Sequence, residues 1–215
     1  MQLTIREPGS AITHFIGCLM ALIAASPLLI KAHGNATYML AMTIFATSMV
    51  LLYAASTIYH SICHVSAKVL RNFQKLDHMM IFVLIAGSYT PVCLLVLTPD
   101  AGYPLLIAVW GIAAAGMLFK LCWVTCPKYI SSIIYVAMGW ACLSVFGQLI
   151  HTLSHAAFSW LLAGGLFYTV GGIIYALRLP FFNARHRNFG SHEIFHLFVM
   201  AGSICHFICM YRYVL

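Results

Sequence analysis

The sequence predicts an all-α protein in which seven helices cross a membrane as one bundle. Only 7% of the 215 residues are charged, against about 25% in an average globular chain. The mean hydropathy is +0.96, and the apolar residues form continuous stretches of about 20 residues, the length needed to span a bilayer. Two-layer soluble folds, disordered tails and small disulfide-rich secreted domains are therefore excluded together.

Seven stretches are long and apolar enough to be spanning helices. In chain order they are 11–30, 38–62, 77–97, 103–124, 131–150, 158–178 and 192–213. The remaining residues form short loops, so we expect residues 1–215 to form a single domain. The apolar runs are continuous and do not alternate with a period of two, which excludes an outer-membrane barrel.

The first stretch has some features of a signal peptide, because Arg6 precedes it and Ala24-Ala25-Ser26 resembles a cleavage site. The apolar region of a signal peptide is about 7–15 residues long. The stretch 11–30 is longer than that, and it opens with the polar pair Thr13-His14. We therefore expect it to remain in the protein as the first helix.

The basic residues predict the orientation of the bundle, because short cytoplasmic loops are enriched in Lys and Arg. Seven spans place nine of the eleven basic residues on one side, namely Arg6, Lys68, Arg71, Lys75, Lys120, Lys128, Arg178, Arg185 and Arg187. Only Lys31 and Arg212 fall on the other side. We expect a cytoplasmic N-terminus and an outside C-terminus. Because the positive charge is divided among loops, it indicates membrane topology and contact with anionic lipid, and we do not expect nucleic-acid binding.

Polar residues of several spans gather at one depth on the predicted cytoplasmic side. The residues concerned are Glu7 and His14 at the first span, Ser56 and His60 at the end of the second, Asp77 and His78 at the start of the third, and His192, Glu193 and His196 at the start of the seventh. Ionisable residues inside spans are costly in lipid and typically functional. The shared depth predicts a site there.

His192 and His196 have the spacing of two metal ligands on one helix. Residues four apart lie on the same face, and two imidazoles so placed suit tetrahedral zinc. His60 has the right depth to supply the third nitrogen, which would leave the fourth position open for water. A purely structural role for these histidines, as interhelical hydrogen-bonding residues, is the alternative.

Two further side chains complete the predicted site. Ser56 lies one helical turn from His60 and would contact what the metal binds. Asp77 is a lone carboxylate that needs a cation or a donor network in lipid. A different interpretation of the same region is the zinc protease pattern HExxH, with Glu193 as general base. That pattern takes a third ligand downstream, where only His206 follows, about 15 Å deeper.

Two other candidates for metal ligands have weaker support. His206 is too deep to share the metal and is expected to form a hydrogen bond between helices. Cys122 and Cys126 form a C-x3-C pair without the second pair that zinc sites of this kind use.

The motifs of three spans resemble the bacterial hemolysin III proteins. The matching segments are Ser56-Thr57-Ile58-Tyr59-His60, Lys75-Leu76-Asp77-His78, Ile85-Ala86-Gly87-Ser88-Tyr89-Thr90-Pro91 and Gly190-Ser191-His192-Glu193-Ile194-Phe195-His196-Leu197-Phe198, followed by Gly202-Ser203 and His206-Phe207. These proteins are grouped with the progestin and adipoQ receptor superfamily, which includes the adiponectin receptors and is related to alkaline ceramidases. The resemblance extends over essentially the whole chain.

The resemblance implies a seven-helix protein of the bacterial inner membrane with a cytoplasmic N-terminus. It also implies a zinc ion held by His60, His192 and His196, with Asp77 holding the zinc-bound water and Ser56 beside it. Relatives carry a Glu, an Asn three residues later and then a His near the N-terminus. Glu7 and His14 match that supporting motif, whereas Ser10 stands where Asn is usual. Relatives vary at position 193, which argues against an obligatory base there.

Two classes of function follow. The first is a zinc-dependent hydrolase of lipid amides or esters, whose partner would be an amphipathic small-molecule substrate taken from the membrane. In it Asp77 accepts a proton from water, and Ser56 or the metal stabilises the oxyanion. The second is a receptor or membrane-homeostasis regulator with structural zinc. Cytolysis is a third possibility suggested by the family name alone.

Overall fold

The computed structural model describes residues 5–177 and 190–215, and every regular element within them is helical. Their bounds are α1 Pro8–Ala32, α2 Ala36–Ser61, α3 Ala67–Pro91 with η1 Val92–Val96, α4 Pro99–Cys122, α5 Lys128–Gly139 with η2 Trp140–Val145 and α6 Phe146–Thr152, α7 His155–Leu177, and α9 Ser191–Cys209 with η3 Met210–Val214. Within the described ranges these elements make seven segments long and apolar enough to span a membrane. The predicted fold class is confirmed.

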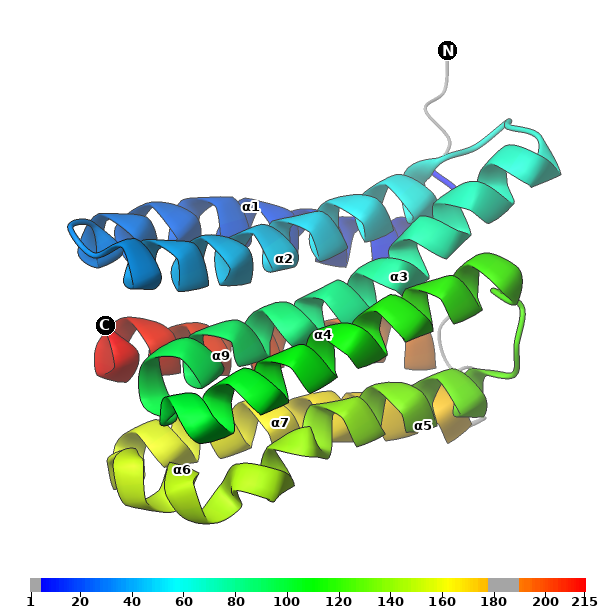
Figure 1. Ribbon diagram of the computed structural model, residues 1–215. Helices are drawn as coiled ribbons and strands as arrows, with labels where there is room; N and C mark the ends of the chain where they lie inside the picture. The colour runs from blue at the N-terminus through cyan, green and yellow to red at the C-terminus, as the bar shows by residue number, and fades with distance from the viewer. Residues whose placement is uncertain (1–4, 178–189) are drawn as a thin grey trace.

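The helices form a closed bundle in which chain neighbours pack antiparallel (Figure 1). Helices α1 to α4 pack successively, and α9 contacts both α1 and α7. A helix cap stabilises the short connection between α1 and α2. The Asn35 side chain accepts hydrogen bonds from the backbone N–H groups of Thr37 and Tyr38, at 2.9 and 3.1 Å. This arrangement brings the start of α9 beside the start of α1.

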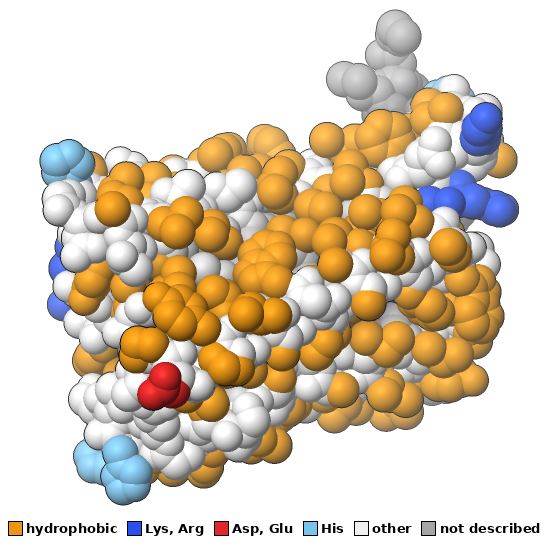
Figure 2. Space-filling view, in the orientation of Figure 1, with side chains coloured by type: hydrophobic (Ala, Val, Ile, Leu, Met, Phe, Trp, Pro, Cys, Tyr) orange, Lys and Arg blue, Asp and Glu red, His pale blue; other side chains and the backbone are white. Residues whose placement is uncertain are grey.

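The surface is that of a membrane protein. Hydrophobic side chains cover the face seen in Figure 2 between the two ends of the bundle, where Lys and Arg gather. Large apolar residues face outward, including Ile107, which is 74% exposed, while Phe45 and Phe82 are fully buried in the core. The protein is a multi-pass integral membrane protein.

The third helix begins ten residues earlier than the hydropathy predicts. It starts at Ala67 instead of residue 77, and the Ser66 hydroxyl caps it by accepting from Val69 N at 3.4 Å. Lys68 and Arg71, expected in a loop, are exposed residues of this helix. Hydropathy detects only the part of a helix inside the hydrocarbon, and this extension is polar. Asp77 therefore lies well inside α3 and not at its start.

The fifth span is interrupted, whereas the sequence predicts a continuous helix over 131–150. The chain forms a 3₁₀ turn over Trp140–Val145 between α5 and α6. The Tyr89 hydroxyl donates to Gly139 O at 2.6 Å and accepts from Cys142 N at 2.9 Å. Because backbone groups inside a membrane must be paired within the protein, this side chain of α3 compensates for the break.

One basic residue counted as a loop charge is buried in the bundle. Lys120 is 1% exposed near the end of α4. Its ammonium donates to Cys126 Sγ at 3.1 Å and to Ser131 Oγ at 2.5 Å. The C-x3-C pair is thereby accounted for, since Cys126 belongs to this buried cluster and Cys122 is exposed. Arg178, Arg185 and Arg187 lie outside the described residues, and the orientation in the membrane stays a prediction.

Candidate metal centre

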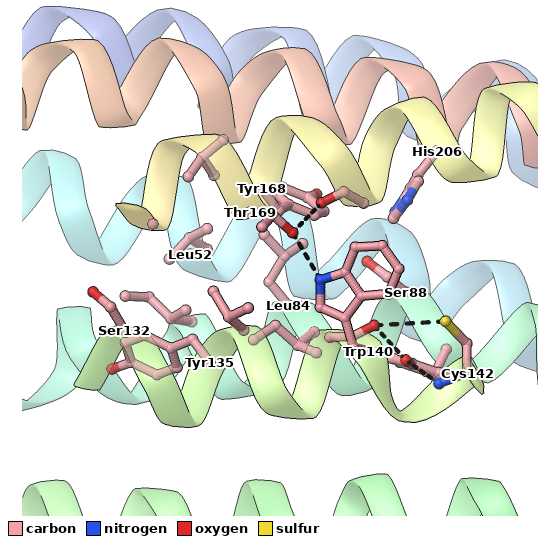
Figure 3. A pocket seen from close by; sticks show the side chains of 18 of the residues that line it. Leu52, Leu84, Ser88, Ser132, Tyr135, Trp140, Cys142, Tyr168, Thr169 and His206 are labelled. Atoms are coloured by element: carbon pink, nitrogen blue, oxygen red, sulfur yellow. Dashed lines mark hydrogen bonds between the residues drawn. The ribbon is translucent and has the colours of Figure 1, made fainter. Parts of the chain in front are cut away.

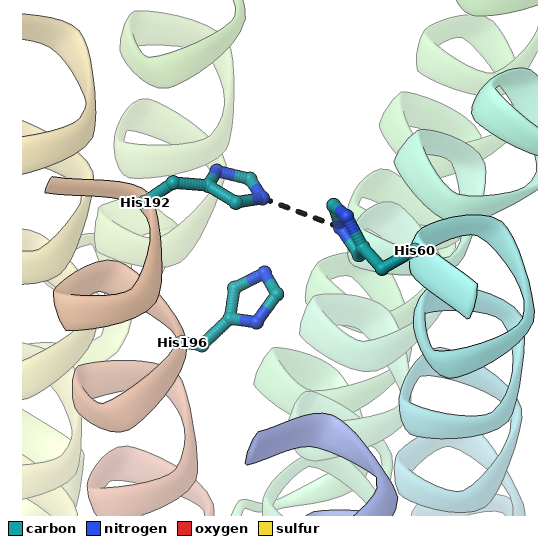
Figure 4. A group of neighbouring side chains, drawn as sticks. All are labelled: His60, His192 and His196. Atoms are coloured by element: carbon teal, nitrogen blue, oxygen red, sulfur yellow. Dashed lines mark hydrogen bonds between the residues drawn. The ribbon is translucent and has the colours of Figure 1, made fainter. Parts of the chain in front are cut away.

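Three imidazoles meet where α2 ends and α9 begins. One ring nitrogen from each of His60, His192 and His196 lies within 4.8 Å of the other two. The Nε2 atoms of His60 and His192 are 3.3 Å apart, and Figure 4 shows the three rings turned toward a common point. The predicted third ligand, His60, is thus brought to the pair on α9 by the packing of helices distant in sequence.

The geometry and chemistry of this group fit zinc. Two nitrogens at about 2.05 Å from a tetrahedral zinc lie about 3.3 Å apart, which is the separation of the His60 and His192 Nε2 atoms. His60 and His196 are buried and His192 is partly buried, so the nitrogens are removed from bulk water. Three neutral imidazoles leave one position of a tetrahedral ion open, as in catalytic zinc sites.

Glu7 orients His60. Its Oε2 atom accepts a hydrogen bond from His60 Nδ1, and its backbone N–H donates to His60 O at 3.0 Å. A carboxylate only accepts, so Nδ1 carries the proton and Nε2 presents its lone pair to the metal position. The same hydrogen bond lowers the pKa of the Glu7 carboxyl. The supporting motif residue therefore acts through a metal ligand.

Thr13 orients His196 in a similar way. Its hydroxyl lies 3.2 Å from His196 Nδ1 and within 3.0 Å of both Gly9 O and Ser10 O. The single hydroxyl hydrogen is directed to the backbone carbonyls, so the oxygen accepts from His196 Nδ1 and leaves Nε2 free. The sequence pattern does not predict this role. Its only signal is the position of Thr13 beside His14.

His14 lies against the group without belonging to it. Its ring stacks on His196 with centroids 3.5 Å apart and planes within 8°, and it meets the Tyr53 ring edge-on at 5.1 Å. Both ring nitrogens are buried, and neither has a hydrogen-bond partner among the residues described. His14 thus packs against the ring of His196 and supplies no nitrogen to the ligand group.

Asp77 and Ser56 line the wall of an adjoining cavity. Asp77 is buried, and its Oδ2 is 3.4 Å from His78 Nδ1, which also approaches Gln74 O at 2.9 Å. Ser56 is buried, and its hydroxyl has no partner within the described part of the chain. Neither side chain falls within the group of ligand atoms. The structure places both beside the centre, not in it.

Glu193 is engaged elsewhere. Its Oε1 accepts from the Ser10 hydroxyl at 2.5 Å, and its Oε2 accepts from Gly190 N at 2.8 Å as the cap of α9. With both oxygens occupied in joining α1 to α9, Glu193 is a structural residue here, and the protease interpretation loses its base. Ser10, which departs from the family pattern, is the partner of this carboxylate.

A cavity of about 170 Å³ extends from this centre into the bundle between α3, α5, α7 and α9. His14, Ser56, Asp77, His192 and His196 line one end. Figure 3 shows part of the remaining wall, including His206. His206 donates from Nε2 to Leu161 O of α7 at 3.3 Å, which confirms its predicted interhelical bond. Three apolar residues of the cavity wall, Leu143, Phe146 and Leu162, are also exposed on the outside of the bundle.

Comparison with known proteins identifies a family. Residues 3–207 match the family described as Haemolysin-III related. The chain is 40% identical to Hemolysin-3 of Bacillus cereus over 217 residues, covering 100% of this chain and 94% of that protein. It is also 40% identical to the Hemolysin-3 homolog of Bacillus subtilis (strain 168), covering 98% and 95%. The progestin and adipoQ receptor-like protein 1 of Caenorhabditis elegans is 29% identical, covering 94% of this chain and 50% of that protein.

Proposed function

The chain belongs to the haemolysin-III related family, and on that premise we propose that it is a zinc-dependent hydrolase of lipid amides or esters in the bacterial cell membrane. One observation supports this most. Three imidazoles converge beside one end of a largely apolar cavity, which two of them, His192 and His196, line, and whose wall holds a buried carboxylate and an unpartnered hydroxyl. An amphiphile could place its polar linkage at the imidazoles and its chain in the cavity.

The chain's own residues would hold and orient the metal. His60, His192 and His196 supply three neutral nitrogens, of which Glu7 and Thr13 set the tautomer of two. Zinc held there would act as a Lewis acid and would lower the pKa of a coordinated water toward about 7. The predicted orientation, with α1 starting in the cytoplasm, would put this site in the inner leaflet.

Asp77 and Ser56 are assigned the proton and oxyanion roles. Asp77 accepts the proton of the attacking water on its carboxylate, with His78 beside Oδ2 to hold its orientation. Asp77 then gives that proton to the leaving nitrogen or oxygen as the C–N or C–O bond of the substrate breaks. Ser56 donates its free hydroxyl hydrogen to the carbonyl oxygen of the substrate as negative charge develops there. Both side chains are buried, so these contacts would form in a site of low dielectric.

A second candidate is a receptor or membrane-homeostasis regulator in which the metal is structural. It is favoured by the fact that the ligands come from α2 and α9. These two helices both pack against α1 and have few contacts with each other. A metal joining them would close the bundle without turnover. The names of the two Bacillus relatives refer to haemolysis, but no feature of the described residues favours lysis of other cells.

The first test is the metal content of the purified protein by mass spectrometry. We expect about one zinc per chain in the wild type and in His33→Ala, a control at an exposed histidine, and none in a His192→Ala/His196→Ala variant. Asp77→Asn should keep the zinc and lose turnover of a lipid amide, while Asp100→Asn at an exposed acid should keep both. Turnover retained in Asp77→Asn would refute the hydrolase mechanism, and a folded wild type without zinc would refute the metal site.

A further inference from the structure

The cavity has a second polar region at the end remote from the three histidines of the metal centre. Ser88 of α3 and His206 of α9 line the cavity there and are 6% and 8% exposed. Ser88 Oγ and His206 Nδ1 are buried and have no hydrogen-bond partner among the described side chains and backbone. Both residues project into the same part of the cavity (Figure 3), and both lie beside Tyr168.

The hydrogen-bonding character of this pair can be assigned. His206 Nε2 lies 3.3 Å from Leu161 O, which can only accept, so Nε2 carries the proton and Nδ1 of the neutral ring is an acceptor. Gly164 allows this approach, since a Cβ there would lie 2.2 Å from His206 Cδ2. The Ser88 hydroxyl is free to donate. The pair therefore offers one acceptor and one donor.

The neighbouring polar side chains form no hydrogen bond with Ser88 Oγ or His206 Nδ1 within the described part of the chain, although the Tyr168 hydroxyl lies near Ser88. The Tyr168 hydroxyl is bonded to Ser203 Oγ at 2.9 Å, and Ser203 also accepts from Tyr53 at 2.7 Å. Trp140 donates to Thr169 at 2.9 Å. These bonds engage Tyr168, Ser203, Trp140 and Thr169, so a ligand that bonds to Ser88 and His206 competes only with the Tyr168 hydroxyl near Ser88.

We propose that Ser88 and His206 form a second polar subsite, which binds the hydroxyl group of a hydroxylated acyl chain lying in the cavity. A hydroxyl donates to His206 Nδ1 and accepts from Ser88 at the same time. A ketone accepts only, and a methylene group leaves both partners unpaired, which is unfavourable for buried polar groups. This proposal rests on the proposed function in one respect, namely that the polar linkage of the ligand lies at the metal centre.

The helix geometry predicts where the hydroxyl lies on the chain. His206 follows His196 by ten residues on α9, and Ser88 follows Asp77 by eleven on α3. At the rise of an α-helix these separations are about 15 and 16.5 Å. An extended alkyl chain of roughly a dozen carbons covers that length, because C–C bonds of about 1.5 Å at tetrahedral angles advance the chain by about 1.25 Å each. The preferred ligand is therefore an acyl chain with a hydroxyl near carbon 12.

Ligand binding by the full chain, purified with its zinc in detergent, tests this subsite. Dodecanoate, 12-hydroxydodecanoate and 6-hydroxydodecanoate each compete against tritiated dodecanoate, so the two hydroxy acids differ only in hydroxyl position. We expect the 12-hydroxy isomer to bind roughly tenfold more tightly than the 6-hydroxy isomer, because one well-formed pair of buried hydrogen bonds has that effect.

Two variants assign the preference to the pair. Ser88→Ala and His206→Phe should each reduce the affinity for the 12-hydroxy isomer to that for the 6-hydroxy isomer, while Ser159→Ala, at an exposed serine of α7, should leave it unchanged. Ser88→Ala removes only a hydroxyl, so it decides the matter if the larger change at His206 prevents folding. Equal binding of the two isomers by the wild type, as expected if water fills the subsite, would overturn the proposal, and so would a preference that persists in Ser88→Ala.

The measurement separates this inference from the proposed hydrolase. Binding of free acids requires no turnover, so a hydroxyl preference without hydrolysis of any lipid amide would support the subsite and refute the enzyme. Turnover of a dodecanoyl amide by a protein that binds both hydroxy isomers equally would support the hydrolase and refute the subsite.

Discussion

Removal of the Glu7 carboxylate should weaken metal binding without removing a ligand. In Glu7→Ala the Glu7–His60 backbone hydrogen bond of 3.0 Å can persist, so the path of the chain is preserved. The lost interaction is the carboxylate's bond to His60 Nδ1, which fixes the tautomer and the ring orientation. Loss of such a partner typically lowers metal affinity about tenfold to hundredfold. We expect a decrease in that range.

The assay is competition for zinc against a chelator of known affinity, on detergent-purified protein at constant pH. Glu7→Gln is the informative second variant, because its amide oxygen still accepts from Nδ1 while the negative charge is gone. Its affinity should lie between those of the wild type and Glu7→Ala. Asp100→Ala, at an exposed acid in the first turn of α4, should bind zinc like the wild type.

If Glu7→Ala binds zinc as tightly as the wild type, the ring of His60 does not need the carboxylate, and the role assigned to the N-terminal motif is wrong. If Glu7→Gln is as weak as Glu7→Ala, the charge of the carboxylate matters and its hydrogen bond does not.

Three further predictions concern the frame of the site. Glu193→Gln should keep zinc and any turnover, and it should lower the free energy of unfolding by about 1 kcal/mol because the cap of α9 is weakened. Loss of turnover with zinc retained would instead show that Glu193 acts as a base. Gly87→Ala should destabilise the bundle by about 1–3 kcal/mol in thermal unfolding, because a Cβ there would lie 2.3 Å from Ser48 Oγ. Gly111→Ala, with nothing within 4 Å, is its control, and equal stability of the two would be contrary to the packing described. Tyr89→Phe should cost about 2 kcal/mol by leaving two backbone groups of the interrupted fifth span unpaired; an unchanged unfolding temperature would show that they find other partners.

The sequence alone determined the all-helical class, the seven spans and the depth at which the polar residues gather. It could do so because lipid accepts only helices or closed barrels, and because a spanning helix must be apolar over a known length. The i, i+4 spacing of His192 and His196 placed them on one face for the same reason of regular helix geometry. Their pairing with His60 was predicted from shared depth, and the packing of α2 and α9 near α1 confirmed that the three side chains meet.

Only the tertiary structure decided the features that depend on contacts between helices. The early start of α3 follows from local capping. The interruption of the fifth span and the burial of Lys120 depend on partners such as Tyr89 and Ser131, which average hydropathy along the chain cannot detect. The positioning role of Thr13 and the use of Glu193 as a cap depend on the start of α1 lying against the start of α9. The polar pair of Ser88 and His206 exists because two helices remote in sequence face one cavity, and side-chain hydrogen bonds of that kind are set by packing and not by periodicity.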